Sequence, residues 1–306
     1  MWQLPEFSFE TALFGILNIN KPPGVTSRDV VNKVRQVYRK ATGKKLKAGH
    51  AGTLDPLATG VLVVCLGRAT KLMSFIQSRP KRYVAEFQMD ASSVSDDTET
   101  ELEFVQPPVA PSLKEIAAAI PSFVGEILQK PPAYSAISIN GQRAYKLARQ
   151  GVEFEIAEKK ITIHDLQIVG YEYPILKLNI ECGSGTYIRS LGRDLANAVG
   201  TKAVMTSLVR TEIGQFKVEE GLEWDSFSME SFREKLQSAA VAVDFLPQRI
   251  VTEDEIELLK HGQFVKCEYL IDGQIAAVNS ENELIAILEP AYGSLKPAIN
   301  FVAGQG

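Results

Sequence analysis

The chain has 306 residues, of which 45% are hydrophobic and 23% are charged, and its formal net charge is −4. This composition excludes a disordered chain, a collagen and a coiled coil, and the length is sufficient for one large domain or two unequal ones. Three cysteines and three histidines are too dispersed to indicate a disulfide framework or a metal site. The longest apolar run, 61–66, is far shorter than the roughly 20 residues of a membrane-spanning helix. Because the first ten residues also lack the basic segment of a secretory signal, we expect a cytoplasmic protein.

Charge is distributed unevenly along the chain. Residues 21–50 contain nine lysines and arginines against one acid, whereas residues 211–306 contain seven basic and 17 acidic residues. A locally basic face on an acidic protein is typical of a polyanion bound at one site. A charged surface that simply faces water is the usual alternative, and charge alone does not decide between them.

The first predicted elements are a strand, a helix and a buried strand. An apolar stretch begins at residue 15 and ends at Pro22, and valines at helical spacing follow a capping-box pattern at 26–29. The glycine-broken loop GHAGTLDP, 49–56, then precedes the apolar strand GVLVVCLG. A helix over 69–78 and an alternating strand over 81–90 complete this part of the chain.

Strands dominate the middle of the chain. After a surface excursion over 91–111, helical patterns appear at 112–120 and 143–151, and strand patterns follow at 161–173 and 175–183. A further amphipathic helix is expected to begin at Thr186 as its N-cap and to end at Gly200. Because strands outnumber helices without regular alternation, we predict an α+β fold with a mixed, largely antiparallel central sheet and flanking helices.

The chain changes character near Pro247. A short helix capped by Thr252, with Glu255 three residues later, precedes short alternating strands between residues 269 and 290. We therefore predict two domains, a catalytic domain over 1–245 and a small C-terminal β-barrel over 246–306.

Asp55 is the strongest candidate for a catalytic group. Gly49 and Gly52 let the backbone approach a ligand closely, Pro56 fixes the exit of the loop, and the strand behind gives rigid support. A carboxylate held in this way can act as a nucleophile or a general base on a sugar or base, although an aspartate near a turn more often caps loop amides. With no second acid paired to it in sequence, a two-carboxylate glycosidase site has no local support.

Further candidate groups lie elsewhere in the sequence. An arginine at position 189 can pair with Asp55, keep it ionised and lower its pKa. Tyr83 and Tyr187 suit either the core or a platform on which an unpaired base stacks. His50, within the loop, can stack on RNA or hydrogen-bond to it.

Five stretches in this order resemble the bacterial tRNA pseudouridine-55 synthase family. They are GILNINKPPGVTSRDVV, GHAGTLDPLATGVLVVCLGRATKL, KRYVAEF, KPPAYSAISINGQRAYKLARQG and SGTYIRSLGRDLA, and they span about residues 14 to 210. The resemblance implies the pseudouridine synthase fold and isomerisation of the T-loop uridine of tRNA, with no cofactor and no required metal. The C-terminal segment is similar, over a short and diverged match, to the PUA-like modules of many members. The resemblance also implies that tRNA is the partner. The protein would act as a monomer and would need no other protein.

The resemblance also implies residue roles. Asp55 would be the catalytic carboxylate, Tyr83 would stack on the flipped uridine, and Arg189 would form an ion pair with Asp55 while Tyr187 packs in the pocket. Further substrate contacts would come from the KPxG lysine, the motif histidine, the glycine and threonine of the GTLDP loop, the pocket leucine and the basic stretch: Lys21, His50, Gly52, Thr53, Leu208, Lys44, Lys45 and Lys47. One departure is visible, because Ser138 stands where members usually have a lysine, which removes an RNA-contacting cation there.

Two alternatives remain open at this stage. One is a relative that acts on a uridine selected by a guide RNA together with protein partners. The other is a non-catalytic RNA-binding or RNA-folding protein in which Asp55 only supports its loop.

Overall fold

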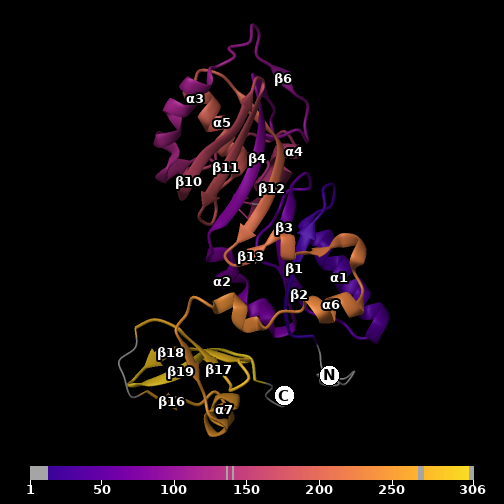
Figure 1. The fold of residues 1–306 in the computed structure, drawn as a ribbon, viewed down its shortest axis with the longest axis vertical. Coiled ribbons are helices and arrows are strands. Elements are labelled where there is room, and N and C mark those ends of the chain that lie inside the picture. Colours follow the sequence, from indigo (N-terminus) through magenta and orange to yellow (C-terminus); the bar gives the residue numbers. More distant parts are fainter. Residues whose placement is uncertain (1–12, 136, 140, 268–271, 303–306) are drawn as a thin grey trace.

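The structure is a computed structural model that describes residues 13–135, 137–139, 141–267 and 272–302 (Figure 1). The first residues of the strands predicted over 269–290 and the N-terminal stretch used to judge a secretory signal lie outside the described residues. None of the described helices combines the length and hydropathy needed to cross a bilayer.

A ten-stranded mixed sheet runs the length of the larger part of the molecule (Figure 1). In order across the sheet lie β14 (Leu222–Glu223), β1 (Gly15–Lys21), β3 (Thr59–Leu66), β12 (Ala203–Ile213), β4 (Lys81–Met89), β11 (Ile175–Cys182), β10 (Lys159–Glu172) and β7 (Gly125–Gln129), with β2 (Ala48–His50) beside β3 and β13 (Phe216–Lys217) beside β12. Only the β1–β14 and β3–β12 pairs are parallel. The predicted mixed, largely antiparallel sheet is therefore confirmed.

Helices and short hairpins flank this sheet. The helices are α1 (Ser27–Thr42), α2 (Met73–Ser78), α3 (Leu113–Ala119), α4 (Ala144–Arg149), α5 (Ile188–Ala198), α6 (Met229–Lys235) and α7 (Glu253–Lys260). Small strand pairs are β5 (Ala91–Ser92) with β6 (Glu103–Phe104) and β8 (Ser138–Ile139) with β9 (Gln142–Arg143), and the 3₁₀ segments used below are η1 (Gly67–Leu72) and η5 (Ala239–Val243).

Strand β3 is apolar throughout because both of its faces are buried. Leu62, Val64 and Leu66 pack into a core that also contains the apolar faces of α1 and α6. The alternate residues Val61, Val63 and Cys65 pack into a second core with η1 and η5. This double burial explains why the sequence around Asp55 passes directly from a polar loop into an uninterrupted apolar run.

The large sheet has a seam between β3 and β12. Only two residue pairs join these strands, Val209 with Thr59 and Arg210 with Gly60. Gly60 has a φ of 97°, and a Cβ there would lie 2.2 Å from the carbonyl oxygen of Arg210. A glycine is therefore required for the close approach of the two strands, and the loop that carries Asp55 lies beside this seam.

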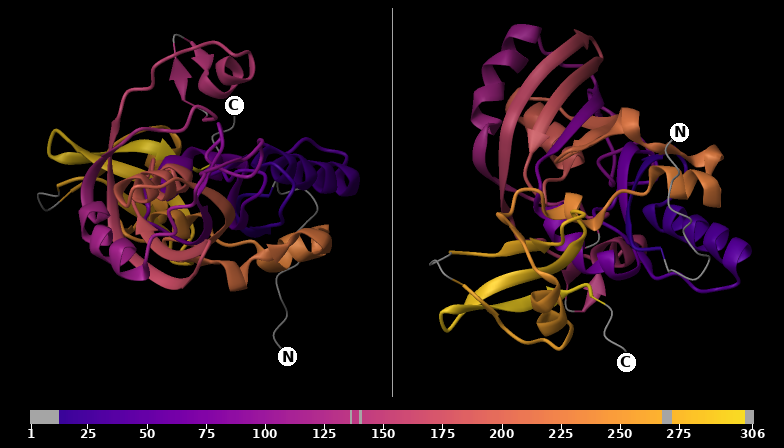
Figure 2. Two further views of the ribbon diagram at one scale, coloured as in Figure 1. Left: turned by 90° about the horizontal axis from the view of Figure 1, so that it is seen from above. Right: turned by 60° about the horizontal axis from the view of Figure 1, so that its bottom comes forward.

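The C-terminal part forms a curled five-stranded sheet, as predicted for a PUA-like module (Figure 2). Its order is β15 (Gln248–Ile250), β17 (Ile275–Val278), β18 (Leu284–Ala291), β19 (Ser294–Asn300) and β16 (Val265–Lys266). Arg249 on β15 donates a hydrogen bond of 2.7 Å to the carbonyl of Lys266 on β16, which links the two outer strands. The predicted capping box of α7, Thr252 with Glu255, is present.

The C-terminal sheet shares a core with the large sheet. Ala276 and Ile287 belong to the same buried cluster as Ile16 and Val63. The ring of Phe301 stacks on Phe14 at 5.7 Å between centroids. The C-terminal sheet thus packs against the larger part through one cluster, while a second cluster, with Ile256 and Leu288, is made only of C-terminal residues.

The N-cap of α5 differs from the sequence-based expectation. Tyr187, not Thr186, is the N-cap residue, and no side chain of its own caps the helix. The hydroxyl of Thr186 instead donates to the carbonyl of Gly183 at 3.2 Å. The amide oxygen of Gln129 takes the capping role from a distant strand, because it accepts the N–H of Tyr187 at 2.8 Å.

Helix α5 lies against β4 with a glycine at the point of contact, and this predicts a stability change. A Cβ on Gly192 would lie 2.0 Å from the buried ring of Phe87. We expect Gly192→Ala to lower the free energy of unfolding, because overpacking costs about 1–3 kcal/mol and exceeds the roughly 1 kcal/mol gained in helix propensity. Urea unfolding measures this, with Gly170→Ala as the control because its Cβ would meet only ordinary contacts, 3.7 Å away. Equal midpoints for the two variants would contradict this packing.

Candidate active site

The loop between β2 and β3 holds Asp55 through contacts to its neighbours on both sides. The hydroxyl of Ser27 donates to the carbonyl of Leu54 at 3.1 Å and accepts its N–H at 2.9 Å. On the other side, the carbonyl of Pro56 accepts the N–H of Gly24 at 2.8 Å and the ammonium of Lys21 at 3.2 Å. The end of β1, the turn after it and the first residue of α1 therefore fix the backbone that carries the carboxylate.

Arg210 supports the first half of the same loop from inside the sheet. Its guanidinium donates to the carbonyls of Val61 at 2.7 Å, Gly52 at 3.0 Å and Thr53 at 3.4 Å. The side chain is almost completely buried. Because a buried guanidinium is costly unless its donors are matched, these carbonyls and the arginine hold one another in place.

Asp55 forms an ion pair with Arg189, as expected from the sequence. The Nε of Arg189 lies 3.0 Å from Oδ2 of Asp55, and Nη2 lies 3.4 Å from Oδ1. The opposite edge of the guanidinium lies 3.3 Å from the carboxylate of Asp97, which is 1% exposed. The same arginine also donates to the carbonyls of Ser95 and Tyr134, at 2.7 and 3.0 Å. Arg189 is thus held between one partly exposed and one buried carboxylate.

Burial raises the pKa of the Asp55 carboxyl above its ordinary value of 3.8. The positive charge of Arg189 opposes this rise in pKa, and the negative charge of Asp97 adds to it. The ion pair is present as expected, but its effect is smaller than that of burial, so the net direction is upward rather than downward. A third of the side chain remains exposed, which leaves the carboxylate accessible.

A cavity of about 320 Å³ opens at Asp55, a volume within the range of small-molecule sites. Seven of the residues selected from the sequence line it: Gly52, Thr53, Asp55, Tyr83, Tyr187, Arg189 and Leu208. The remaining wall comes from Leu54, Gln77, Lys81, Tyr134, Ser135, residues 183–186, Ile188 and Arg210. Segments that are far apart in sequence therefore converge on the Asp55 loop.

The floor of the cavity is a face of the sheet. Lys81 and Tyr83 alternate with exposed residues along β4, so their side chains lie on one face. On the neighbouring strand β12, Leu208 and Arg210 lie on the same face, and Arg210 is directly opposite Tyr83. Tyr83 is 7% exposed, and burial raises its pKa. Its ring can therefore present a face or an edge to the cavity while its phenol stays protonated at neutral pH.

Gln129 fixes the position of Tyr187. Its amide bonds to both main-chain groups of Tyr187, accepting the N–H at 2.8 Å and donating at 3.1 Å to the carbonyl, which also accepts the N–H of Leu191. Gln129 is 1% exposed at the end of β7. The start of α5, which carries Arg189 two residues later, is thereby tied to the edge of the sheet.

Five of the predicted contact residues lie away from the cavity. Lys21 is completely buried and donates to three carbonyls, those of Pro22, Val25 and Pro56. His50 is half-buried at the end of β2, and burial lowers its pKa. The basic stretch forms the exposed turn after α1, where Lys44, Lys45 and Lys47 face solvent.

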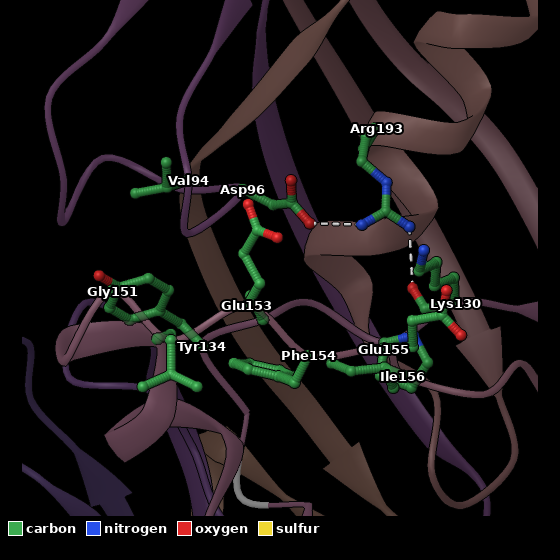
Figure 3. A pocket seen from close by; sticks show the side chains of 14 residues that line it. Val94, Asp96, Lys130, Tyr134, Gly151, Glu153, Phe154, Glu155, Ile156 and Arg193 are labelled. Carbon is green, nitrogen blue, oxygen red and sulfur yellow. Dashed lines mark hydrogen bonds and ion pairs between the residues drawn. The ribbon is translucent and has the colours of Figure 1, made fainter.

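Tyr134 also lines a second, larger cavity of about 770 Å³ (Figure 3). Arg193 bridges its wall, pairing with Asp96 at 2.7 Å and donating to the carbonyl of Lys130 at 2.8 Å. Tyr134 lines both cavities. Arg189 and Arg193 lie one turn apart on α5. Arg189 donates to the carbonyl of Tyr134 and Arg193 to that of Lys130, so together they hold the segment 130–134.

Lys81 and Arg210 in the cavity wall, and Asp97 and Gln129 that hold Arg189 and Tyr187, were missed by the sequence analysis. Lys81 and Arg210 carry a signal, since each lies two residues from a selected residue on an alternating strand and so shares its face. Asp97 and Gln129 reach the site only through the fold, and their local sequence gives no indication of it.

Curated relatives of this chain include proteins named as tRNA pseudouridine synthases. The chain is 39% identical to "tRNA pseudouridine synthase B" of Dehalococcoides mccartyi over 94% of its own length and 96% of the relative. It is 40% identical to the protein of that name from Clostridium acetobutylicum, with 84% and 87% covered. The model of the "TruB family pseudouridylate synthase (N terminal domain)" matches residues 39–188.

Solved structures with this fold include two assemblies. One is described as an H/ACA RNP bound to a substrate RNA containing 2'-deoxyuridine, with a TM-score of 0.70, 22% identity, and 95% of this chain and 86% of that chain covered. The other is a Cbf5-Nop10-Gar1 complex with a TM-score of 0.70, 24% identity and the same coverage. At 22% and 24% identity, these two structures show only that the fold is shared. The curated relative from Dehalococcoides mccartyi is similar in sequence over 94% of the chain. The chain thus belongs to the TruB family of pseudouridylate synthases.

Proposed function

We propose that this enzyme converts the T-loop uridine of tRNA to pseudouridine as a single chain in the cytoplasm, with Asp55 as the catalytic carboxylate. The observation that carries the proposal is the Asp55–Arg189 ion pair, with a Nε–Oδ2 distance of 3.0 Å, at the opening of a cavity that Tyr83 and Tyr187 line. Relatives about 40% identical over most of the chain, named as tRNA pseudouridine synthases, support the choice of tRNA.

The reaction requires a uridine that has left the RNA stack. Extruding a base costs a few kcal/mol, and stacking on an aromatic ring returns about 1–3 kcal/mol per base. Tyr83 and Leu208, on adjacent strands of the cavity floor, offer such a surface. The bond between C1′ of the ribose and N1 of uracil then breaks, the base turns, and C5 bonds to C1′. Asp55 faces the cavity in which these atoms would lie.

The alternative of a guide-directed enzyme has the fold likeness in its favour. The H/ACA assembly and the Cbf5 complex share this fold, with 22% and 24% identity. The curated relatives match more closely and over more than 80% of the chain. Activity of the purified chain on an unmodified tRNA transcript, with nothing else added, supports the proposed function and contradicts guide dependence.

Replacing the carboxylate tests its role. We expect Asp55→Asn to lower the rate of pseudouridine formation at least about 10³-fold, measured by carbodiimide mapping of a tRNA transcript. Asp225→Asn, an exposed aspartate, is the matched control and should keep the parent's rate. Thermal unfolding should not occur at a lower temperature in Asp55→Asn, because Arg189 retains Asp97. An Asp55→Asn protein as active as the parent would rule out the assigned role.

The raised pKa of Asp55 predicts the acid limit of activity. The ionised carboxylate is the active form, so the single-turnover rate should fall as pH falls through a pKa above 3.8. Asp97→Asn removes a negative charge that raises this pKa. The acid limb of the pH–rate profile, where the rate falls with falling pH, should therefore move to lower pH. An acid limb that moves upward in this variant would contradict the electrostatic account.

The exposed basic turn after α1 predicts the salt dependence of tRNA binding. If Lys44, Lys45 and Lys47 bind phosphates, replacing all three by Ala should make the plot of log affinity against log salt concentration less steep by about 0.9 for each phosphate that is no longer neutralised. Lys114, Lys202 and Lys260, exposed on other elements, give a control triple variant with the same change in charge. Equal slopes for both triple variants, measured by filter binding, would remove this turn from the interface.

A further inference from the structure

Two buried lysines near the Asp55 loop differ in their hydrogen bonding. Lys21 is completely buried, and its three ammonium protons have three carbonyl acceptors between 2.8 and 3.2 Å. Lys81 is 6% exposed, but among the described residues it has a single acceptor, the carbonyl of Gln77. Within that part of the chain, no carboxylate lies within 4 Å of the Lys81 ammonium. Lys21 is therefore satisfied by the protein, and Lys81 is not.

Lys81 lies in the wall of the catalytic cavity. It shares the face of β4 with Tyr83 and has Cys182 opposite it on β11. The charged neighbour that acts on it most strongly is another cation, Arg210. Burial lowers the pKa of Lys81 to about 8, so most of the ammonium remains protonated at neutral pH. Because Lys81 lines the cavity and the protein takes only one of its donors, the remaining donors are available to acceptors of a substrate bound there.

The proposed reaction produces such acceptors. When the bond between C1′ and N1 breaks, its electron pair stays with uracil, and the negative charge spreads over the two carbonyl oxygens of the ring. The anion then forms a bond from C5 to C1′, C5 loses its proton and N1 gains one, so the product is an isomer. Hydrogen-bond donors already in place for a charge that develops in the transition state lower the barrier to its formation.

We propose that Lys81 donates a hydrogen bond to a carbonyl oxygen of the departing uracil and stabilises its negative charge while the glycosidic bond is broken. This inference rests on the proposed function. Lys81 keeps its proton throughout, and Asp55 remains the group that acts on the ribose or the base. Contact with a backbone phosphate is the competing explanation for the unmatched donors, and it predicts a loss of affinity rather than of rate.

The test compares two leaving groups in single-turnover reactions of a tRNA transcript. Lys81→Met keeps the length of the side chain and removes its charge, and should lower the rate on uridine about 10²-fold with a dissociation constant within about 3-fold of the parent's by filter binding. A transcript with 5-fluorouridine carries a base whose anion is stabilised by fluorine. On this transcript, Lys81→Met should therefore lower the rate of glycosidic bond cleavage by a several-fold smaller factor than on uridine. Lys81→Gln, also uncharged, should show the same dependence and replaces Lys81→Met if that variant unfolds.

Leu208→Ala is the control for a cavity change without loss of charge. It should lower the rate by the same factor on both transcripts. Lys81 variants with equal losses on uridine and 5-fluorouridine, or with a loss confined to affinity, would overturn the inference while leaving the proposed function intact. A parent protein that converts neither transcript would overturn both.

Discussion

The site depends on one guanidinium held between two carboxylates. Arg189 contacts the accessible Asp55 on one edge and the buried Asp97 on the other, and two carbonyls take its remaining donors. A single buried pair would leave a costly charge whenever its partner was protonated or engaged by substrate. With Asp97 as a permanent partner, the arginine remains neutralised, and Asp55 is free to change its state. Asp97 thus neutralises Arg189 within the fold, and Asp55 is left for the reaction.

The fold brings this ion pair together at the seam of its large sheet. The strands β3 and β12 touch over two residue pairs, and Gly60 permits the contact. Arg210 crosses the seam and holds the Asp55 loop through the carbonyls of Gly52 and Thr53. From the far edge, Gln129 ties down the start of α5. Rigid elements on both sides therefore fix the distance between Asp55 and Arg189, as a pre-organised site requires.

Local patterns in the sequence predicted the elements and much of the cavity. Alternation along β4 and the capping boxes of α1 and α7 are confirmed, because each depends on residues only a few positions apart. The N-cap of α5 could not be predicted, since its hydrogen bonds come from Gln129, 58 residues away. The pKa direction of Asp55 was wrong for a similar reason. Its ion pair was visible in the motifs, but the extent of its burial is a property of the assembled fold.

The two buried lysines show where pattern and structure have to be combined. The KPxG motif pointed to Lys21 as a substrate contact, yet its protons are taken up by the carbonyls of the segment that supports the Asp55 loop. Lys81 was not predicted from the sequence, although it lies two residues before Tyr83 on the same face of β4. Burial and charge are alike for the two side chains, so neither property separates their roles. The number of protein acceptors does, because the donors of Lys81 that the protein leaves unmatched are available to a molecule in the cavity, whereas those of Lys21 are not.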